Sequence, residues 1–353
     1  MYQLNPLTAH QPKPLSSGAS KARPVFKLKP LALFFAALTV SGSALAWQPE
    51  RPVEFVVTSG AGGGTDTFAR TVQSIIGKHQ LMDKSIIVSN KGGGSGAEGY
   101  VYSASSKDDP YKLTFGTNNE YLLPEVGEMP YAAEDLQPVA AMAMDEFLIW
   151  VNGDAEYESA KDFIDAAKQN PGKMQFAGSQ SKDTDQTLVS MIEEATGTEF
   201  RYVPFNGGSQ ALVQLAGGHV DANVNNPNEN LGQWQAGMIK PLCVFSPDPL
   251  PKGEPVYEDK GWGDIPTCQS QGIDISEYRM PRTVWLPAGA PEEAVTYYQE
   301  LLKKVSETPE WKDYVTRTVQ TSQFLSGDEL EQYIDNNAST VKKVFEQEGW
   351  SAS

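Results

Sequence analysis

A glycine-rich junction close to residue 60 restricts the fold of this chain more than any other feature. Residues 53–59 (VEFVVTS) are apolar and β-branched, which is typical of a buried strand. Four glycines then fall between Gly60 and Gly64, and a helical pattern begins after Asp66. Glycine accepts positive φ and lets the backbone approach a ligand closely. The junction therefore predicts a strand, a tight turn and a helix whose first N–H groups can face a ligand.

The same alternation of strand and helix recurs along the chain. Strands are predicted over 53–59, 85–90, 112–117, 174–178, 200–205, 220–226 and 240–246, with one more inside 136–152. Helices are predicted over 67–79, 100–106, 159–172, 183–197 and 207–218. Segment 247–291 is rich in proline and glycine and is predicted to be mostly loop. Two closing helices are predicted to start at Pro291 and at Ser326, where Glu329 would complete a capping box. This order predicts an α/β fold with mostly parallel sheets flanked by helices.

The first part of the chain has the pattern of a secretory signal peptide. The first acidic residue is Glu50, and basic residues precede an apolar run at 31–40 (LALFFAALTV). Ala44 and Ala46 then form an A-x-A cleavage pattern. We expect residues 1–46 to be removed after Ala46 and the protein to reach the periplasm. An uncleaved membrane anchor is the alternative, although the apolar run is short for a membrane span.

Charge and cysteine content restrict the partners and the compartment. The net charge is −17, which argues against nucleic acid as a partner because nucleic-acid binding needs a clustered basic surface. The chain has two cysteines, Cys243 and Cys268. Export to an oxidising compartment favours a disulfide between them over two separate buried thiols.

Three strand-to-helix turns contain unusual numbers of glycines and hydroxyl residues. They are 59–66, 90–99 and 177–186, and turns of this kind lie at one edge of a parallel sheet. Their hydroxyl donors are Ser59, Thr65, Ser95, Ser179, Ser181 and Thr184. Free N–H groups, the positive ends of helix dipoles and hydroxyls together bind an oxyanion without a basic side chain. Asp66 does not suit an anion site; it either caps its helix, pairs with Arg70 or receives a polar group of the ligand.

Catalytic patterns are weak. Gly94, Gly96 and Gly99 match G-x-G-x-x-G, with Glu120 about 20 residues further on, but a single match of this kind is a weak indication of a dinucleotide site. Nicotinamide cofactors are also found mainly in the cytoplasm, whereas this protein is expected to be exported. His79 and His219 have no metal-ligand spacing and no neighbouring nucleophile. The sequence thus predicts that the protein is not an enzyme and has neither a cofactor site nor a metal site.

Several ordered motifs resemble one family. They are GGGTDTFAR (62–70), NKGGGSGAEG (90–99), VPFNGGSQALVQLAGGHVDANVNN (203–226) and TVWLPAGAPEEAV (283–295). In this order they resemble the periplasmic solute-binding receptors of tripartite tricarboxylate transporters, also called the Bug family. Two departures stand out. The first turn opens with Ser59-Gly60-Ala61 where the family often has Pro-Gly-Gly, and segment 181–186 lacks the family's frequent histidine.

The resemblance implies a two-domain periplasmic-binding-protein fold that closes around a small carboxylate, with crossing strands as the hinge. We expect domain 1 to comprise 47–145 plus 243–353, and domain 2 to comprise 146–242. The ligand would be a di- or tricarboxylate or an aromatic acid, held mainly by turns 59–66 and 177–186. The partners would be the membrane permease subunits of a tripartite tricarboxylate transporter. A sensor subunit with the same fold is the alternative, and an exported oxidoreductase or hydrolase is a weaker one.

The candidate ligand-binding residues come from the glycine turns and from neighbouring asparagines. They are Ser59, Gly62, Gly63, Gly64, Thr65, Asp66, Asn118, Ser179, Gln180, Ser181, Thr184, Asn206, Gly207 and Asn223. Asp183 and Asp185 raise a difficulty, because they would repel a second carboxylate unless they cap the helix or hold a cation.

Overall fold

The computed structural model describes residues 47–205 and 207–351, and contacts group these residues in one compact unit. The predicted signal peptide and Asn206 lie outside the described residues. Within the described ranges the strands form two sheets. The first has six strands in the order β11-β4-β10-β3-β1-β2, and the second has five in the order β7-β6-β8-β5-β9.

The first sheet joins three parallel strands to three antiparallel ones. The parallel strands are β1 (Val53–Val57), β2 (Ile86–Asn90) and β3 (Lys112–Gly116). The antiparallel strands are β4 (Leu136–Glu146), β10 (Arg279–Pro287) and β11 (Gln320–Leu325). Around them lie α1 (Gly64–His79), α2 (Ala97–Ala104), α3 (Asn119–Val126), η1 (Ala133–Asp135), α8 (Glu292–Glu307), α9 (Pro309–Arg317) and α10 (Asp328–Gln347). Both faces of this sheet are covered. Val284 packs in the core with Phe68 and Trp311, and its neighbour Trp285 packs on the opposite side with Tyr121 and Phe345.

The second sheet is built in the same way. Its parallel strands are β6 (Gln175–Ser179), β7 (Arg201–Phe205) and β8 (Ala222–Asn225), and its antiparallel strands are β5 (Leu148–Asn152) and β9 (Ile239–Val244). The helices that belong to it are α4 (Ala160–Gln169), α5 (Thr184–Thr196), α6 (Gly208–Ala216) and α7 (Pro227–Gln235). Phe163 and Phe176 lie in the core on one face, and Trp150 and Trp234 lie in the core on the other.

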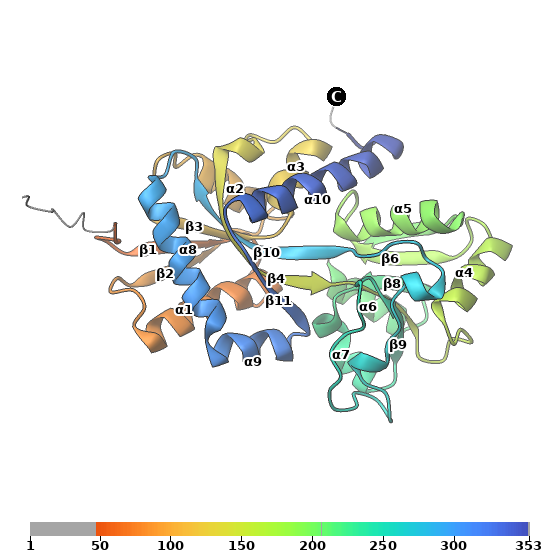
Figure 1. Ribbon diagram of the computed structural model, residues 1–353. Coiled ribbons are helices and arrows are strands. Elements are labelled where there is room, and N and C mark those ends of the chain that lie inside the picture. Colours follow the sequence, from red (N-terminus) through yellow and green to blue (C-terminus); the bar gives the residue numbers. More distant parts are fainter. Residues whose placement is uncertain (1–46, 206, 352–353) are drawn as a thin grey trace, which may run out of the picture. The chain divides into compact units, whose positions relative to one another are not determined.

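Two adjacent strands connect the sheets. β4 ends at Glu146 and β5 begins at Leu148, so Phe147 alone separates strands of different sheets. β10 pairs with β4 from Arg279 opposite Glu146 to Pro287 opposite Leu136. Figure 1 shows the two strands side by side between the two groups of elements. Residues 136–152, where the sequence predicted one strand, therefore hold two.

The prediction that segment 247–291 is mostly loop is wrong at its end, because β10 occupies Arg279–Pro287. Prolines and arginines in RMPRTVWLP hide its strand character, but residues 281–287 are all buried beside β4. Before it, η2 (Trp262–Asp264) and η3 (Gln269–Gln271) are short 3-10 turns. Each sheet is mixed, so parallel pairing is less extensive than predicted. The sequence analysis also did not predict α3, α7, α9 and β11.

Two predicted helix starts also shift. α1 begins at Gly64 with Gly63 as its N-cap, so Asp66 lies inside the first turn and the prediction that Asp66 caps the helix is wrong. α10 begins after Gly327, and no side chain caps it, so the predicted capping box at Ser326 is wrong. In both helices a glycine takes the cap position.

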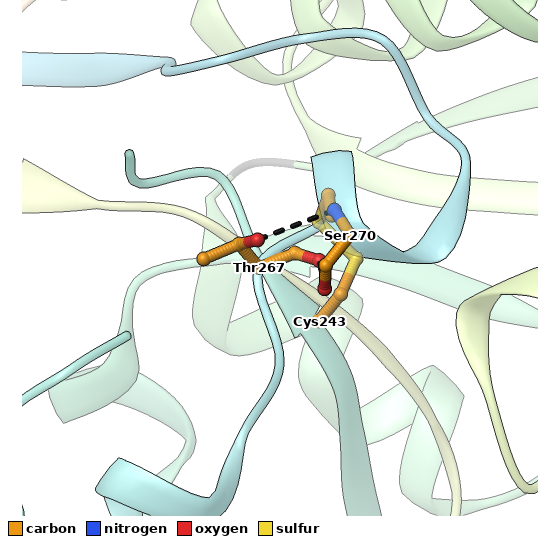
Figure 2. Close-up of a disulfide and its surroundings, with 4 residues drawn as sticks. Cys243, Thr267 and Ser270 are labelled. Atoms are coloured by element: carbon orange, nitrogen blue, oxygen red, sulfur yellow. Dashed lines mark hydrogen bonds between the residues drawn. A yellow bond between two sulfur atoms is a disulfide. The ribbon is translucent and has the colours of Figure 1, made fainter. Parts of the chain in front are cut away.

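Cys243 of β9 and Cys268 form a disulfide across a sequence separation of 25 residues. Figure 2 shows this bond beside a turn in which the Ser270 N–H donates to Thr267 Oγ1 over 3.3 Å. Cys268 N–H also donates to Val244 O over 2.8 Å. The segment that leads from β9 toward β10 is thereby tied to the second sheet. Among the described residues, no helix combines the length and the apolar character that a membrane span requires.

Candidate ligand-binding site

A cavity of about 220 Å³ lies where helices of both sheets begin. From the first sheet and its turns it is lined by Thr58, Ser59, Gly64, Thr65, Ser95, Thr117, Asn119 and Arg282. From the second sheet and its turns it is lined by Ser179, Gln180, Asp183, Thr184, Asp185, Gly208, Asn225, Asn226 and Glu229. Phe147 and Met280, next to the connection between the sheets, complete the lining. The wall is almost entirely polar, so it suits a small polar ligand.

The starts of six helices converge on this cavity. Asn119 begins α3, Asn226 caps α7, and Ser95 precedes Gly96, the N-cap of α2. The remaining three helices, α1, α5 and α6, contribute their first residues, Gly64, Thr184 and Gly208. The first N–H groups of a helix lack partners within the helix, and the helix dipole makes this end positive. Each helix start contributes a positive partial charge and N–H donors to the cavity, which favours an anion.

Arg282 of β10 is the basic side chain of the described lining. Its side chain is 6% exposed, and its guanidinium forms a buried ion pair with Asp145 of β4. Nη1 donates to Thr65 Oγ1 over 3.0 Å, whereas Nε has no hydrogen-bond partner in the described chain. Burial alone would lower the pKa of Arg282, but Asp145 outweighs it and raises the pKa. The guanidinium is therefore a permanent cation whose hydrogen-bond donors are only partly used by Thr65 and Asp145.

The turn before α1 directs its acid away from the cavity. The Asp66 carboxylate accepts from Gly62 N over 2.8 Å, from Arg70 Nε over 2.9 Å and from Asn90 Nδ2 over 2.9 Å. Burial favours a higher pKa for Asp66, but these donors outweigh it and lower the pKa. The pair with Arg70, one of the sequence-based interpretations, is confirmed. Asp66 thus stabilises the turn as an ionised group.

The turn before α5 places two acids in the cavity wall. Asp183 is the N-cap of α5 and accepts from Thr184 N over 2.7 Å. Asp185 accepts from Ser179 N over 2.7 Å and from Ser179 Oγ over 3.0 Å. Burial raises the pKa of both carboxyl groups, that of Asp185 to about 7, because these hydrogen bonds offset the burial only in part. Among the described residues, neither acid forms an ion pair.

The glycine turn at 90–99 contacts the turn at 177–186 across the cavity. Ser95 Oγ donates to Gln180 Oε1, and Asn119 Nδ2 donates to Ser95 O over 3.2 Å. Ser95 has φ 58° and Gln180 has φ 36°, a left-handed conformation that is uncommon outside glycine. Ser95 follows β2 of the first sheet, and Gln180 follows β6 of the second sheet. This hydrogen bond therefore joins the two walls of the cavity.

The structure separates the candidate site residues into two sets. Those that line the cavity are Ser59, Gly64, Thr65, Ser179, Gln180 and Thr184. Those that do not are Gly62, Gly63, Asp66, Asn118, Ser181, Gly207 and Asn223. Gly62 and Asp66 border a separate surface groove between α1 and α9. Asn118 and Asn223 are buried behind the wall, with polar atoms that have no partner in the described chain.

Several lining residues were missed at the sequence level. Asn226 and Glu229 come from the turn after β8, where Pro227 at the first helical position marks a helix start. The run NNPNEN (225–230) could have indicated this fourth strand-to-helix turn. Asn225 Nδ2 donates to Asn230 Oδ1 over 2.8 Å, and Asn226 Nδ2 donates to Glu146 O over 2.8 Å. Arg282 had no such signal, because it lies in the strand that was predicted as loop.

The two sheets connected by crossing strands, with one polar cavity at their helix starts, define a solute-binding protein of the periplasmic type. A family model described as "Tripartite tricarboxylate transporter family receptor" matches residues 68–350, and the chain belongs to this family. The resemblance seen in the sequence motifs is confirmed, and the family is one of receptors and not of enzymes. Within the described residues, no group of three or more His, Cys, Asp or Glu side chains is placed to hold a metal ion.

Relatives and solved structures agree with this assignment. BugT of Bordetella pertussis is 27% identical over 204 residues, which cover 57% of this chain and 62% of BugT. A TctC solute-binding protein from Polaromonas, solved without ligand, has a TM-score of 0.69 and 27% identity over 85% of this chain and 99% of its own. Rpa4515 of R. palustris, solved with adipate, has a TM-score of 0.73 and 25% identity over 86% of this chain and 99% of its own. The two-domain α/β fold class expected from the sequence is confirmed.

Proposed function

We propose that this protein is a periplasmic receptor that captures a small organic carboxylate in the cavity and delivers it to a tripartite tricarboxylate permease. The convergence of six helix starts on one polar cavity carries the proposal. Such a site binds a carboxylate through N–H groups and hydroxyls that are already in place. The adipate bound to Rpa4515, a relative of similar fold, supports the same ligand chemistry.

The ligand contacts we propose come from the lining residues of both sheets. Ser59, Gly64 and Thr65 would bind one end of the ligand, together with the guanidinium of Arg282. Thr184 and the other lining residues of its turn, Ser179 and Gln180, would bind the other end. Gly62, Gly63 and the acid Asp66 would act indirectly, because they shape the turn that presents Gly64 and Thr65.

Capture and release would use the strands that connect the sheets. Phe147 alone separates β4 from β5, and β10 passes beside it, so small dihedral changes there would move one sheet group against the other. The domain division at about residues 146 and 242 remains our proposal. Export would depend on residues 1–46, and a protein recovered from the periplasm should begin at Trp47. Intact-mass measurement of that protein tests the cleavage position.

Isothermal titration of the exported protein with mono-, di- and tricarboxylates tests the binding function. We expect one of these classes to bind. We expect Arg282→Gln to lower the affinity for that ligand by about 10- to 100-fold, because a charged hydrogen bond is lost. Arg317→Gln, at an exposed arginine paired with Asp313, is the matched control and should bind normally. Thr65→Val, which retains the Arg282–Asp145 pair, keeps the test valid if Arg282→Gln unfolds.

Equal affinity in wild type and in both cavity variants would contradict the site. Delivery is tested separately, by uptake of the identified ligand into cells that carry the permease with or without this receptor. Uptake that does not depend on the receptor would contradict the transport role and leave the binding function in place.

A further inference from the structure

The two walls of the cavity differ in charge. Acidic side chains line only the wall from the second sheet, where Asp183, Asp185 and Glu229 lie among the described lining residues. Arg282 is the basic residue of that lining; Asp145 forms an ion pair with it, and burial raises the pKa of Glu229 although the charge of Arg282 acts to lower it. A ligand that enters this cavity therefore meets helix starts and hydroxyls on one side and three carboxyl groups on the other.

These carboxyl groups are held in place by the fold. The Asp185 carboxylate accepts two hydrogen bonds from Ser179, and the Asp183 carboxylate accepts two from Thr184, one from its N–H and one from its hydroxyl. Glu229 lies in the first turn of α7, and its carboxylate is so close to Gly208 that a Cβ there would be 2.4 Å from Oε2. The acids thus form part of a built wall with defined positions.

This wall does not suit the second carboxylate of a dicarboxylate ligand. A second anion would face three acids and no unpaired base of the described lining, which is unfavourable at short range. A ligand group with N–H donors and positive charge would satisfy the same acids. The lining contains one aromatic residue, Phe147, whereas quaternary ammonium groups are recognised by several aromatic rings. An ammonium group that keeps its N–H donors fits the wall better.

We propose that the carboxylate bound by this receptor also carries a primary ammonium group, which the carboxyl groups of Asp183, Asp185 and Glu229 bind. The carboxylate lies against the starts of the first-sheet helices and Arg282, and the ammonium group lies against the second-sheet wall. This inference rests on the proposed function, since it specifies the ligand class of the same cavity. It also explains why the turn at 177–186 carries acids where an anion site would not need them.

Calorimetric titration with matched pairs of short acids tests the proposal. Butyrate is compared with γ-aminobutyrate, and glutarate with glutamate, all in the presence of EDTA. We expect the amino-bearing member of at least one pair to bind about 10- to 100-fold more tightly than its partner without nitrogen. Asp185→Asn and Glu229→Gln should remove most of this preference. Glu158→Gln, at a second-sheet residue whose side chain is 78% exposed, is the matched control and should keep it.

The sign of proton exchange gives a second, independent measurement. Asp185 is faced by Asp183, Glu229, Tyr202 and Tyr278, and burial keeps it partly protonated near neutral pH. An ammonium ligand should displace that proton, so titrations at pH 7 in buffers of different ionisation enthalpy should show proton release. Proton uptake would mean that a carboxylate of the ligand binds protonated acids, and it would overturn the proposal.

The outcomes separate the two proposals. If acids without nitrogen bind as tightly as their amino-bearing partners, the ammonium proposal fails and the carboxylate receptor stands. If butylamine binds as tightly as γ-aminobutyrate, or if no member of the panel binds, the carboxylate function itself fails. If the preference for the amino group survives in Asp185→Asn and Glu229→Gln, the proposed wall is not where the ammonium group binds.

Discussion

The segments that form α1 and α5 share the order of strand, turn and helix with an acid in the first helical turn, but these acids have opposite environments. Asp66 faces away from the cavity, receives donors from Arg70 and Asn90, and has a lowered pKa. Asp185 lines the cavity, receives donors only from Ser179, and has a pKa raised to about 7. The comparison shows that a similar local motif gives either a structural anion or an acid open to a ligand. A basic side chain within reach makes the difference.

The largest expected difference between the turns comes from their glycines. A Cβ at Gly64 would be 2.7 Å from Arg282 Nη2, and a Cβ at Gly178 would be 2.5 Å from the Tyr202 hydroxyl. Gly64→Ala should displace the guanidinium and weaken ligand binding by about 10- to 100-fold while the protein stays folded. Gly178→Ala should mainly destabilise the fold, by about 1–3 kcal/mol, because the added methyl group has no room.

Calorimetric affinities and thermal midpoints of both variants measure this contrast. Gly197→Ala is unsuitable as a control because φ is 66° there, but Gly77→Ala in α1, with open space around it, should keep the ligand affinity and raise the thermal midpoint slightly, because alanine favours a helix more than glycine does. A Gly64→Ala protein with normal affinity would mean that Arg282 does not contribute to binding.

Neutralising the two acids should change stability in opposite directions. At pH 8, Asp66→Asn should destabilise the protein by about 1–3 kcal/mol, because it removes charge-assisted hydrogen bonds to a buried carboxylate. Asp185→Asn should leave the unliganded protein as stable as wild type or more stable, because it removes a buried charge that has no basic partner. Urea unfolding of both variants measures the difference in stability. Destabilisation of equal size in both variants would contradict the prediction.

The pH dependence of these effects should also be opposite. The pKa of Asp185 in the folded state is raised from 3.8 to about 7, so the folded protein binds this proton first and stability rises as the pH falls from 8 to 4. The contribution is on the order of a few kcal/mol. Asp66 has a lowered pKa, so its stabilisation is present above about pH 4 and is lost below it.

Differences in unfolding free energy between wild type and each Asn variant, measured from pH 3 to pH 8, isolate these two groups from the other acids. A difference that does not vary with pH for Asp185→Asn would show that this carboxyl group titrates normally.

The smallest expected effect concerns the hydrogen bond between the turns. Ser95→Ala removes the donor to Gln180, and we expect ligand affinity to fall by about two- to tenfold because one neutral hydrogen bond is lost. Stopped-flow measurements should show the change mainly as faster dissociation. Ser105→Ala, at an exposed serine that bonds only to Tyr102 O in its own helix, is the control. Unchanged dissociation in Ser95→Ala would mean that the contact does not hold the ligand in place.

Local patterns in the amino-acid sequence were sufficient for the glycine turns, for most strands of the parallel parts and for the α/β class. Periodicity and turn chemistry act over a few residues, so 53–59 and 174–178 could be assigned without knowledge of their neighbours. The anion-binding character of helix starts also follows from local backbone geometry, which is why Gly64, Thr65 and Thr184 were among the residues predicted to face the ligand.

Features that depend on distant partners emerged only from the tertiary structure. Arg282 contacts Thr65 across 217 positions of sequence and Asp145 across 137, so nothing near Arg282 indicates a place in the cavity. The division of 136–152 into β4 and β5 depends on pairing with β10, which itself looked like loop. Whether an acid in a turn is ionised depends on burial and on the bases that the fold brings near it, and only the assembled protein provides them.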